Sequence, residues 1–242
     1  MKMPSVRYEK ENALGRVTLA RASEANRLTF EMMEELTQAL LQAGEECDVI
    51  LLSGEGADFC AGRESVRGGA GLPPVNVIRE RFRRIVKMND ALEFSPAVTV
   101  AALRGRAYGP GAGLVSRADI VLASDTARIA FPEIKEGFPP TVVISHLARK
   151  LSRRDGFEMV ITGREIDAEE GRRIGMVNHV VADGKLDAEA ERLCAELCAL
   201  GGDSLKPTKS FYRFAETARP EANADHAVNL IANAIHAKGN VG

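Results

Sequence analysis

The alternation of short apolar runs with longer amphipathic stretches predicts an α/β chain that becomes helical toward its end. Residues 97–103 (AVTVAAL) are a continuous apolar run, short enough for a buried strand, and 118–123 form a second such run. The opening segments 6–10 and 16–20 flank a polar turn and predict a β-hairpin. Further short strands are expected at 49–52, 128–131 and 176–181.

Apolar residues at helical spacing predict two long helices in the first half of the chain. Thr29 is a candidate N-cap for a helix that runs to about Glu46. A second helix is predicted over 75–94, and Ser95-Pro96 ends it. The second half of the chain is mostly helical, with helices expected within 142–151, 155–162, 168–174, 186–200, 206–216 and 221–238.

The second predicted helix carries a basic stripe of Arg79, Arg83 and Lys87. Positions spaced by four residues lie on one side of a helix. A solvated face accounts for the stripe, and we prefer that interpretation. The alternative is a flank that attracts a phosphorylated ligand. The glycine-rich loop 53–74, which precedes this helix, is long enough to be functional or mobile.

A glycine-rich turn joins the two buried strands. Gly105, Gly109, Gly111 and Gly113 allow backbone to approach a ligand closely, and Pro110 suits a first helical position. A strand that leads into a helix N-terminus directs free N–H groups and partial positive charge at one spot. That spot favours an anion, or an oxygen that becomes one. An ordinary tight strand–helix corner explains the turn equally well when the turn is taken alone.

Composition and charge narrow the function classes. The chain has 242 residues, enough for one large domain or one domain with a small appendage, and its 45% hydrophobic and 27% charged residues are typical of globular proteins. A net charge of −2 indicates neither nucleic acid nor an anionic membrane as a partner. No apolar run is long enough to span a bilayer, and the first residues lack the apolar core of a signal peptide.

Cysteine and histidine usage predicts a cytoplasmic protein without a metal site. The four cysteines contain no CxxC pair and are interpreted as reduced thiols. The four histidines are scattered without metal-ligand spacing. Nucleophile-elbow, P-loop and HExxH motifs do not occur in the sequence.

Four segments, in order, resemble the crotonase superfamily, that is, the enoyl-CoA hydratase/isomerase family. RASEANRL at 21–28 is similar to the family's R-P-x-x-x-N-A-L, and FCAGRE at 59–64 to F-[SA]-A-G-x-D. Residues 104–124 are similar to N-G-x-A-x-G-G-G-x-x-L-x-x-x-x-D-x-x-x-A-S. FPEIKEGFPP and the later TGREIDAEEGRRIGMV resemble the last conserved part of the family pattern. The matches keep family order and spacing from about residue 6 to residue 181.

The resemblance implies an α/β fold, a crotonase-like spiral of ββα units with a C-terminal helical region. It divides the chain into a spiral core at 1–185 and a helical trimerisation region at 186–242. It implies an acyl-CoA small molecule as substrate, with coenzyme A as part of that substrate and no separate cofactor. Neither nucleic acid nor membrane is expected as a partner, and a homotrimer or homohexamer is expected.

In this family the thioester carbonyl sits between two backbone N–H groups, which hold the enolate by electrostatic preorganisation. The resemblance assigns the first donor to Ala61. The second donor falls on Pro110, which has no N–H. Either Gly111 supplies that N–H after a small shift, or the oxyanion hole is one-sided.

Hydratases of the family usually carry two catalytic glutamates, and this sequence matches one of them. The later glutamate corresponds to Glu133, for which a surface acid or helix-start residue is the plain alternative; the earlier one falls on Gly113. Asp119 is expected to be a structural acid, and Pro139–Val143 replaces a glycine-rich turn beside the acyl pocket. The substrate-binding residues implied by the resemblance are Ala25, Gly62, Arg63, Glu64 and Tyr108.

One carboxylate can remove a proton at one carbon and return it at another, whereas hydration divides naturally between two carboxylates. The sequence therefore predicts an enoyl-CoA hydratase/isomerase type of enzyme, with isomerase chemistry slightly ahead. A CoA-thioester decarboxylase or hydrolase of the same superfamily is the first alternative. A non-catalytic acyl-CoA-binding paralogue is the second. A glycine-loop nucleotide-binding domain is the third, although GPGAGL lacks the final glycine of G-x-G-x-x-G.

Overall fold

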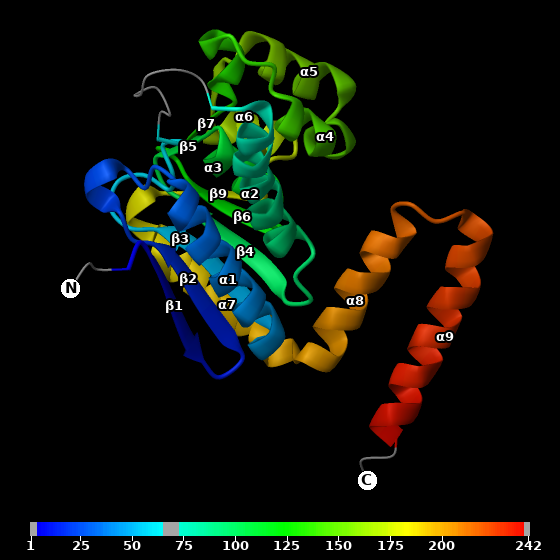
Figure 1. The fold of residues 1–242 in the computed structure, drawn as a ribbon. Coiled ribbons are helices and arrows are strands. Elements are labelled where there is room, and N and C mark those ends of the chain that lie inside the picture. The colour runs from blue at the N-terminus through cyan, green and yellow to red at the C-terminus, as the bar shows by residue number, and fades with distance from the viewer. Residues whose placement is uncertain (1–3, 65–72, 240–242) are drawn as a thin grey trace.

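A six-stranded sheet lies at the centre of the fold in the computed structural model, which describes residues 4–64 and 73–239. The first two strands form the predicted antiparallel hairpin, and every later strand of this sheet joins its neighbour in parallel. The strand order in the sheet follows the chain (Figure 1). The strands are β1 (Val6–Glu11), β2 (Leu14–Leu19), β3 (Val49–Gly54), β4 (Val98–Leu103), β6 (Ile120–Ser124) and β9 (His179–Val181).

A second, three-stranded sheet consists of β5 (Arg106–Tyr108), β7 (Arg128–Ala130) and β8 (Glu165–Asp167). β5 and β8 were not predicted, because three residues are too few to show an alternating pattern. Successive units each contribute one long strand to the large sheet and one short strand to the small one, as β4–β5 and β6–β7 do. Cys60, after β3, continues this pattern by an isolated parallel bridge to Ala107.

The helices agree closely with the expected positions. The Thr29 side chain caps α1 by accepting a hydrogen bond from the Met32 N–H, as predicted. α8 begins at Gly202 rather than at Lys206, because its second turn accommodates Pro207 with the loss of one backbone hydrogen bond. The helices are α1 (Phe30–Glu46), α2 (Val75–Glu93), α3 (Pro110–Val115), α4 (Thr141–Lys150), α5 (Arg153–Thr162), α6 (Ala168–Arg173), α7 (Leu186–Leu200), α8 (Gly202–Ala215) and α9 (Pro220–Gly239).

Both faces of the large sheet are covered. α1 packs on one face together with α2, and α7 packs on the other face through Leu186, Ala190 and Cys194. β4 is buried along its whole length, as its apolar sequence predicts. α7 thus belongs to the packed body, although the sequence places it in the helical region that starts at residue 186. α8 and α9 extend away from the rest of the chain as a helical hairpin (Figure 1).

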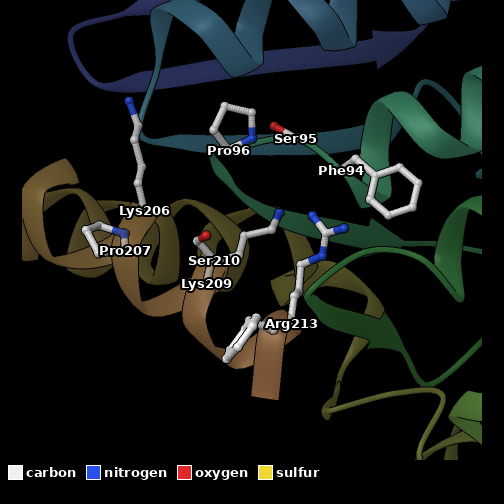
Figure 2. A pocket seen from close by; sticks show the side chains of 9 residues that line it. Phe94, Ser95, Pro96, Lys206, Pro207, Lys209, Ser210 and Arg213 are labelled. Carbon is white, nitrogen blue, oxygen red and sulfur yellow. The ribbon is translucent and has the colours of Figure 1, made fainter. Parts of the chain in front are cut away.

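α8 is joined to the sheet by an ion pair whose lysine is buried. Lys209 lies 2.6 Å from Asp119 and donates a 2.8 Å hydrogen bond to the Ala97 carbonyl. Asp119 also accepts hydrogen bonds from the backbone and the hydroxyl of Thr99, so its predicted structural role is confirmed. The pair lies beside a cavity of about 610 Å³ between the end of α2 and α8 (Figure 2). The cavity is lined by Phe94, Ser95, Pro96, Lys206, Pro207, Lys209, Ser210, Arg213 and Phe214.

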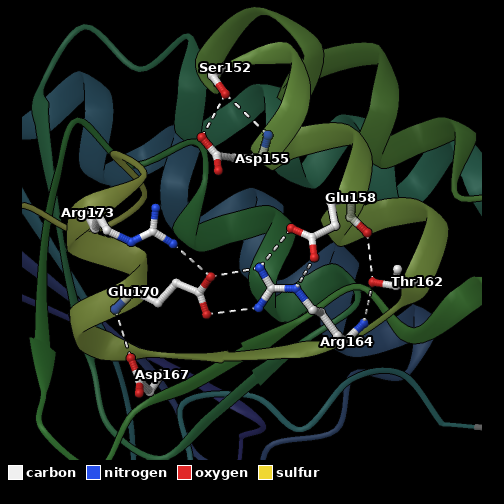
Figure 3. A network of polar contacts seen from close by, with 8 residues as sticks. All are labelled: Ser152, Asp155, Glu158, Thr162, Arg164, Asp167, Glu170 and Arg173. Carbon is white, nitrogen blue, oxygen red and sulfur yellow. Dashed lines mark hydrogen bonds and ion pairs between the residues drawn. The ribbon is translucent and has the colours of Figure 1, made fainter.

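Arg164 links α5 and α6 through its side chain, in the part of the chain between β7 and β9 (Figure 3). Its guanidinium donates two hydrogen bonds to Glu170, of 2.7 and 2.8 Å, and two to Glu158, both of 3.1 Å. The hydrogen bonds from Arg164 are the main cause that lowers the pKa of the Glu170 carboxyl. Bidentate arginine–carboxylate pairs fix geometry as well as charge. None of the described helices is both long and apolar enough to cross a membrane.

Asn26 holds the loop that precedes α1. Its side-chain oxygen accepts the Arg21 N–H at 2.9 Å, and its amide nitrogen donates to the carbonyls of Glu55 and Asp58 at 2.9 and 2.7 Å. The residue is completely buried and has a left-handed backbone, with φ of 52°. Three otherwise unpaired backbone groups therefore depend on this one amide. It connects the loop to the segment that leads to Cys60.

We expect Asn26→Ala to lower the free energy of unfolding by about 3 kcal/mol, because buried backbone groups would lose their partners. Urea unfolding measures the change. Asn12→Ala is the matched control, since Asn12 also has a left-handed backbone, with φ of 54°, but is exposed. Equal losses in the two variants would show that backbone strain alone explains the effect.

Candidate active site

Glu133 is the central carboxyl of the candidate site. It lies in a short 3₁₀ helix, Pro132–Glu136, directly after Phe131. Its Oε2 atom is buried and has no hydrogen-bond partner within the described part of the chain. Burial raises the pKa of Glu133, and the negative charge of Glu136 raises it further, while Arg63 opposes the shift. A buried carboxyl with a free oxygen and a raised pKa is suited to proton transfer.

The carboxyl of Glu133 approaches the backbone at Gly109. A β-carbon placed on Gly109 would lie 3.2 Å from Oε1 of Glu133, and its φ of 50° already disfavours a side chain. The Gly109 N–H donates a 2.9 Å hydrogen bond to the Ala130 carbonyl at the end of β7. Pairing between β5 and β7 therefore positions the glycine turn beside the carboxyl. The need for glycine at position 109 follows from both the backbone angle and this contact.

Ala61, the expected first N–H donor, is not available for that role. The Ala61 N–H donates a 2.9 Å hydrogen bond to the Ala25 carbonyl, so it is not free for a ligand. The Leu28 N–H donates to the Gly62 carbonyl, and the Leu28 carbonyl accepts from the Glu64 N–H. In a parallel bridge the residue between these two groups directs its own N–H to the opposite side.

That intervening residue is Arg63. Among the described residues its N–H has no acceptor, and it faces the side on which Cys60 pairs with Ala107 and the glycine turn begins. The sequence resemblance placed the donor two residues earlier, because the motif alone does not show which N–H groups the Ala25–Leu28 loop occupies. Arg63 is therefore the better candidate for the first donor.

The expected second donor position lies at the start of α3. Pro110 begins α3 and has no N–H. Gly111 follows it in the first helical turn, where an N–H has no partner within the helix. A β-carbon on Gly111 would lie 2.6 Å from the carbonyl oxygen of Cys60 and 2.9 Å from its sulfur. Gly111 is therefore packed too closely against Cys60 to carry a side chain.

The Arg63 side chain is half-buried against two aromatic rings rather than in open solvent. Its guanidinium lies 5.8 Å from the Phe30 ring centre and 5.7 Å from that of Phe82. Burial lowers the pKa of this guanidinium, whereas the charges of Glu136 and Glu133 raise it. The structure thus brings Arg63 and Glu133 into one electrostatic environment. This position agrees with a role for Arg63 in the site.

Other residues expected to bind substrate are occupied elsewhere. Glu64 is exposed and forms a 2.7 Å ion pair with Arg21. The Tyr108 hydroxyl donates to Glu165, and burial followed by this hydrogen bond raises the pKa of Tyr108 to about 12. The Tyr108 side chain is thus directed to the small sheet. Its backbone carbonyl still lies beside Gly62, 3.8 Å from where a β-carbon would be.

The basic stripe on α2 is a solvated face. Arg79, Arg83 and Lys87 are all exposed, and Arg83 forms an ion pair with Glu80 one turn away. On the neighbouring side of α2, Arg81 and Arg84 each lie 5.7 Å from the Phe30 ring centre. The remaining part of the loop before α2, residues 65–72, lies outside the described residues.

Among the polar residues of the interior that sequence reasoning missed, Asn89 lies nearest to the glycine turn. Asn89 stands on the buried side of α2, four residues after Ile85 and three before Leu92, and is 2% exposed. An asparagine at apolar helical spacing was the available signal. In residues 4–64 and 73–239, no group of three or more histidine, cysteine or acidic side chains is arranged to hold a metal ion.

Comparison with known proteins gives the family of the chain. The family model for enoyl-CoA hydratase/isomerase matches residues 9–239. A candidate enoyl-CoA hydratase of Thermus thermophilus is 32% identical over 191 residues, covering 76% of this chain and 74% of that protein. Enoyl-CoA hydratase domain-containing protein 3 of Rattus norvegicus is 28% identical over 193 residues, covering 79% of this chain and 64% of that protein.

A solved structure shares the fold over nearly the whole chain. The crystal structure of an enoyl-CoA hydratase from Mycobacterium smegmatis superimposes with a TM-score of 0.88 at 26% identity, covering 95% of this chain and 90% of that one. The layered units and the C-terminal helices thus form the crotonase fold expected from the sequence. Since the family match extends over most of the sequence, the chain belongs to the enoyl-CoA hydratase/isomerase family of the crotonase superfamily.

Proposed function

We propose that this protein acts on an acyl-CoA thioester, with Glu133 transferring a proton next to the thioester carbonyl. The observation that carries the proposal is the buried, unpartnered Oε2 of Glu133 beside the glycine turn. A surface acid or a simple helix-start residue would have its carboxyl in water. The raised pKa of Glu133 also keeps the carboxyl closer to the range in which it exchanges protons.

We place the thioester carbonyl at the N–H of Arg63, and the position of the second donor at the step from Pro110 to Gly111. Removal of the α-proton produces an enolate, and its negative oxygen is stabilised by N–H groups that already point to it. The acyl-CoA would follow the segment of Ala25, Ala61, Gly62 and Arg63. Relatives named enoyl-CoA hydratases support this class of substrate.

Isomerase chemistry remains our first proposal, because a single carboxyl can move one proton between two carbons. Gly113 supplies no second carboxylate, so hydration would require Glu133 to activate water and protonate carbon in turn. A CoA-thioester decarboxylase or hydrolase is the alternative within the superfamily. A non-catalytic acyl-CoA-binding protein is the second alternative, favoured by the missing N–H of Pro110.

We expect Glu133→Gln to reduce turnover of crotonyl-CoA or of a 3-enoyl-CoA by about 10²–10⁴-fold, because the amide keeps the shape but cannot accept the proton. Affinity for the CoA ester should change little. Steady-state kinetics and calorimetry measure the two quantities. Glu136→Gln, an exposed acid in the same 3₁₀ helix, is the matched control. Full activity in Glu133→Gln would assign the proton transfer to another residue.

Thermal melting against pH verifies that the glutamine variant is folded and that the carboxyl is buried. Because the pKa of Glu133 is raised by folding, the wild type loses stability as pH rises from the ordinary glutamate pKa through the raised one. Glutamine does not titrate, so the variant should melt at a higher temperature than the wild type near neutral pH. The difference should vanish below the ordinary glutamate pKa. A flat difference across pH would mean that Glu133 is solvated.

We expect Pro110→Gly to increase turnover, because it restores a backbone N–H where the family resemblance places the second donor. One such donor is worth up to about 10²–10³ in rate. Loss of the proline should cost up to about 1 kcal/mol of stability, which is measured separately by melting. Pro74→Gly, at the start of α2, is the control for loss of proline. An unchanged rate would show that Gly111 already serves as the second donor.

We also propose a homotrimer or homohexamer assembled through the helical hairpin. α9 exposes Val228, Ile231 and Ile235, which are 64%, 58% and 66% exposed. Light scattering at micromolar concentration should give three or six times the mass of one chain. Ile231→Lys combined with Ile235→Lys should reduce that mass. Phe157→Lys combined with Ile161→Lys, an exposed pair at the same spacing on α5, should not. A monomeric wild type would contradict the proposal.

A further inference from the structure

We infer that the Asn89 amide binds a hydroxyl group on the acyl chain of the substrate, beside Gly113. The inference rests on the proposed function, since it concerns the same acyl thioester. It adds a chemical class to that proposal: acyl chains that carry a hydroxyl at the fourth carbon. Asn89 would be a specificity-determining residue, while Glu133 would remain the group that transfers the proton.

The burial of Asn89 is the first observation. The residue is 2% exposed, and its neighbours on the same side of α2 are the buried Ile85, Met88 and Leu92. The Oδ1 atom of Asn89 is enclosed and has no hydrogen-bond partner in the described part of the chain. An unpaired buried acceptor is unfavourable, and any leucine-like side chain would avoid that penalty. A ligand group that donates to Oδ1 would remove it.

The position of Asn89 relative to α3 is the second observation. A β-carbon on Gly113 would lie 3.7 Å from both Oδ1 and Nδ2 of Asn89. The Gly113 N–H donates to the Gly109 carbonyl at 2.9 Å, so Gly113 follows Gly109 by one helical turn. Glu133 approaches the helix at Gly109, and Asn89 approaches it at Gly113. The carboxyl of Glu133 and the amide of Asn89 thus lie beside successive turns of α3, at two glycines that carry no side chain.

The spacing of these turns corresponds to the length of a short acyl chain. Four helical residues rise by about 6 Å, which is roughly the span of four carbon–carbon bonds. A carbonyl held near the first turn would leave a hydroxyl oxygen on the fourth carbon, four bonds from the carbonyl carbon, near the second. Since Cβ bonds on a helix tilt toward its N-terminus, the space in front of Gly113 faces back toward the glycine turn.

The chemistry of an amide decides which group it would bind. Asparagine offers an acceptor and a donor and does not exchange protons near neutral pH. A hydroxyl donates to Oδ1 and accepts from Nδ2, whereas a plain hydrocarbon chain leaves Oδ1 unpaired. Sites built to hydrogen-bond a hydroxyl discriminate strongly against analogues that lack it. Asn89 therefore favours a hydroxylated acyl chain and would not act as a second acid or base.

Calorimetry with three esters tests the inference: butyryl-CoA, 3-hydroxybutyryl-CoA and 4-hydroxybutyryl-CoA. The host is the Glu133→Gln protein, so that no ester is converted during the titration. We expect 4-hydroxybutyryl-CoA to bind about tenfold more tightly than butyryl-CoA and more tightly than 3-hydroxybutyryl-CoA. Adding Asn89→Leu should abolish this preference while retaining the affinity for butyryl-CoA. Adding Ser95→Ala, which removes another enclosed and unpartnered oxygen, should leave the preference intact.

Gly113→Ala provides a second variant in case the leucine variant does not fold. Its methyl group fits at ordinary contact distance from the amide and would cover it, so the preference should again be lost. Equal binding of all three esters, or a preference that persists in Asn89→Leu, would overturn the inference and leave the proposed function standing. Failure of every ester to bind would instead overturn the proposed function, and the inference with it.

Discussion

The close approach of a carboxyl to a glycine backbone is the constraint on which the candidate site depends. Glu133 can point at Gly109 only because that residue has no side chain and a left-handed φ. The position of Gly109 depends in turn on the pairing of β5 with β7 and on its hydrogen bond to Ala130. The small sheet is therefore as important to the site as the large one. Pairing of these three-residue strands positions the carboxyl of Glu133 and the glycine turn next to each other.

The long elements were predictable because their local signals agree with their environment. β4 is a continuous apolar run and is buried along its length, and the Thr29 side chain caps α1 as its position suggests. The short strands β5 and β8 were not predictable, since three residues are too few to show an alternating pattern and both strands depend on pairing with β7. Packing between distant segments, rather than propensity, decides their conformation. The same cause explains why α7 joins the body of the fold.

In the site, too, the sequence motif identified some residues, whereas contacts between distant segments determine others. The match around Pro132-Glu133 identified a carboxyl that the structure buries beside the glycine turn. The motif could not show that the Ala61 N–H is occupied by the Ala25 carbonyl, because that bond joins two loops 36 positions apart in the numbering. Nor could it show that Asn89 faces Gly113. Backbone hydrogen bonding between loops determines which groups are free for chemistry, and a single sequence records it only indirectly.

The packing of Gly111 against Cys60 bears on how this site can change during evolution. The nearest atom to a β-carbon at position 111 would be a backbone oxygen, so no replacement of Cys60 would make room for a side chain there. Position 113, by contrast, has only ordinary contacts in front of it, and position 110 already holds a proline. Within four residues, one position is fixed and its neighbours are open to variation. New side chains, and with them new chemistry, can therefore enter the turn without disturbing the backbone that supports it.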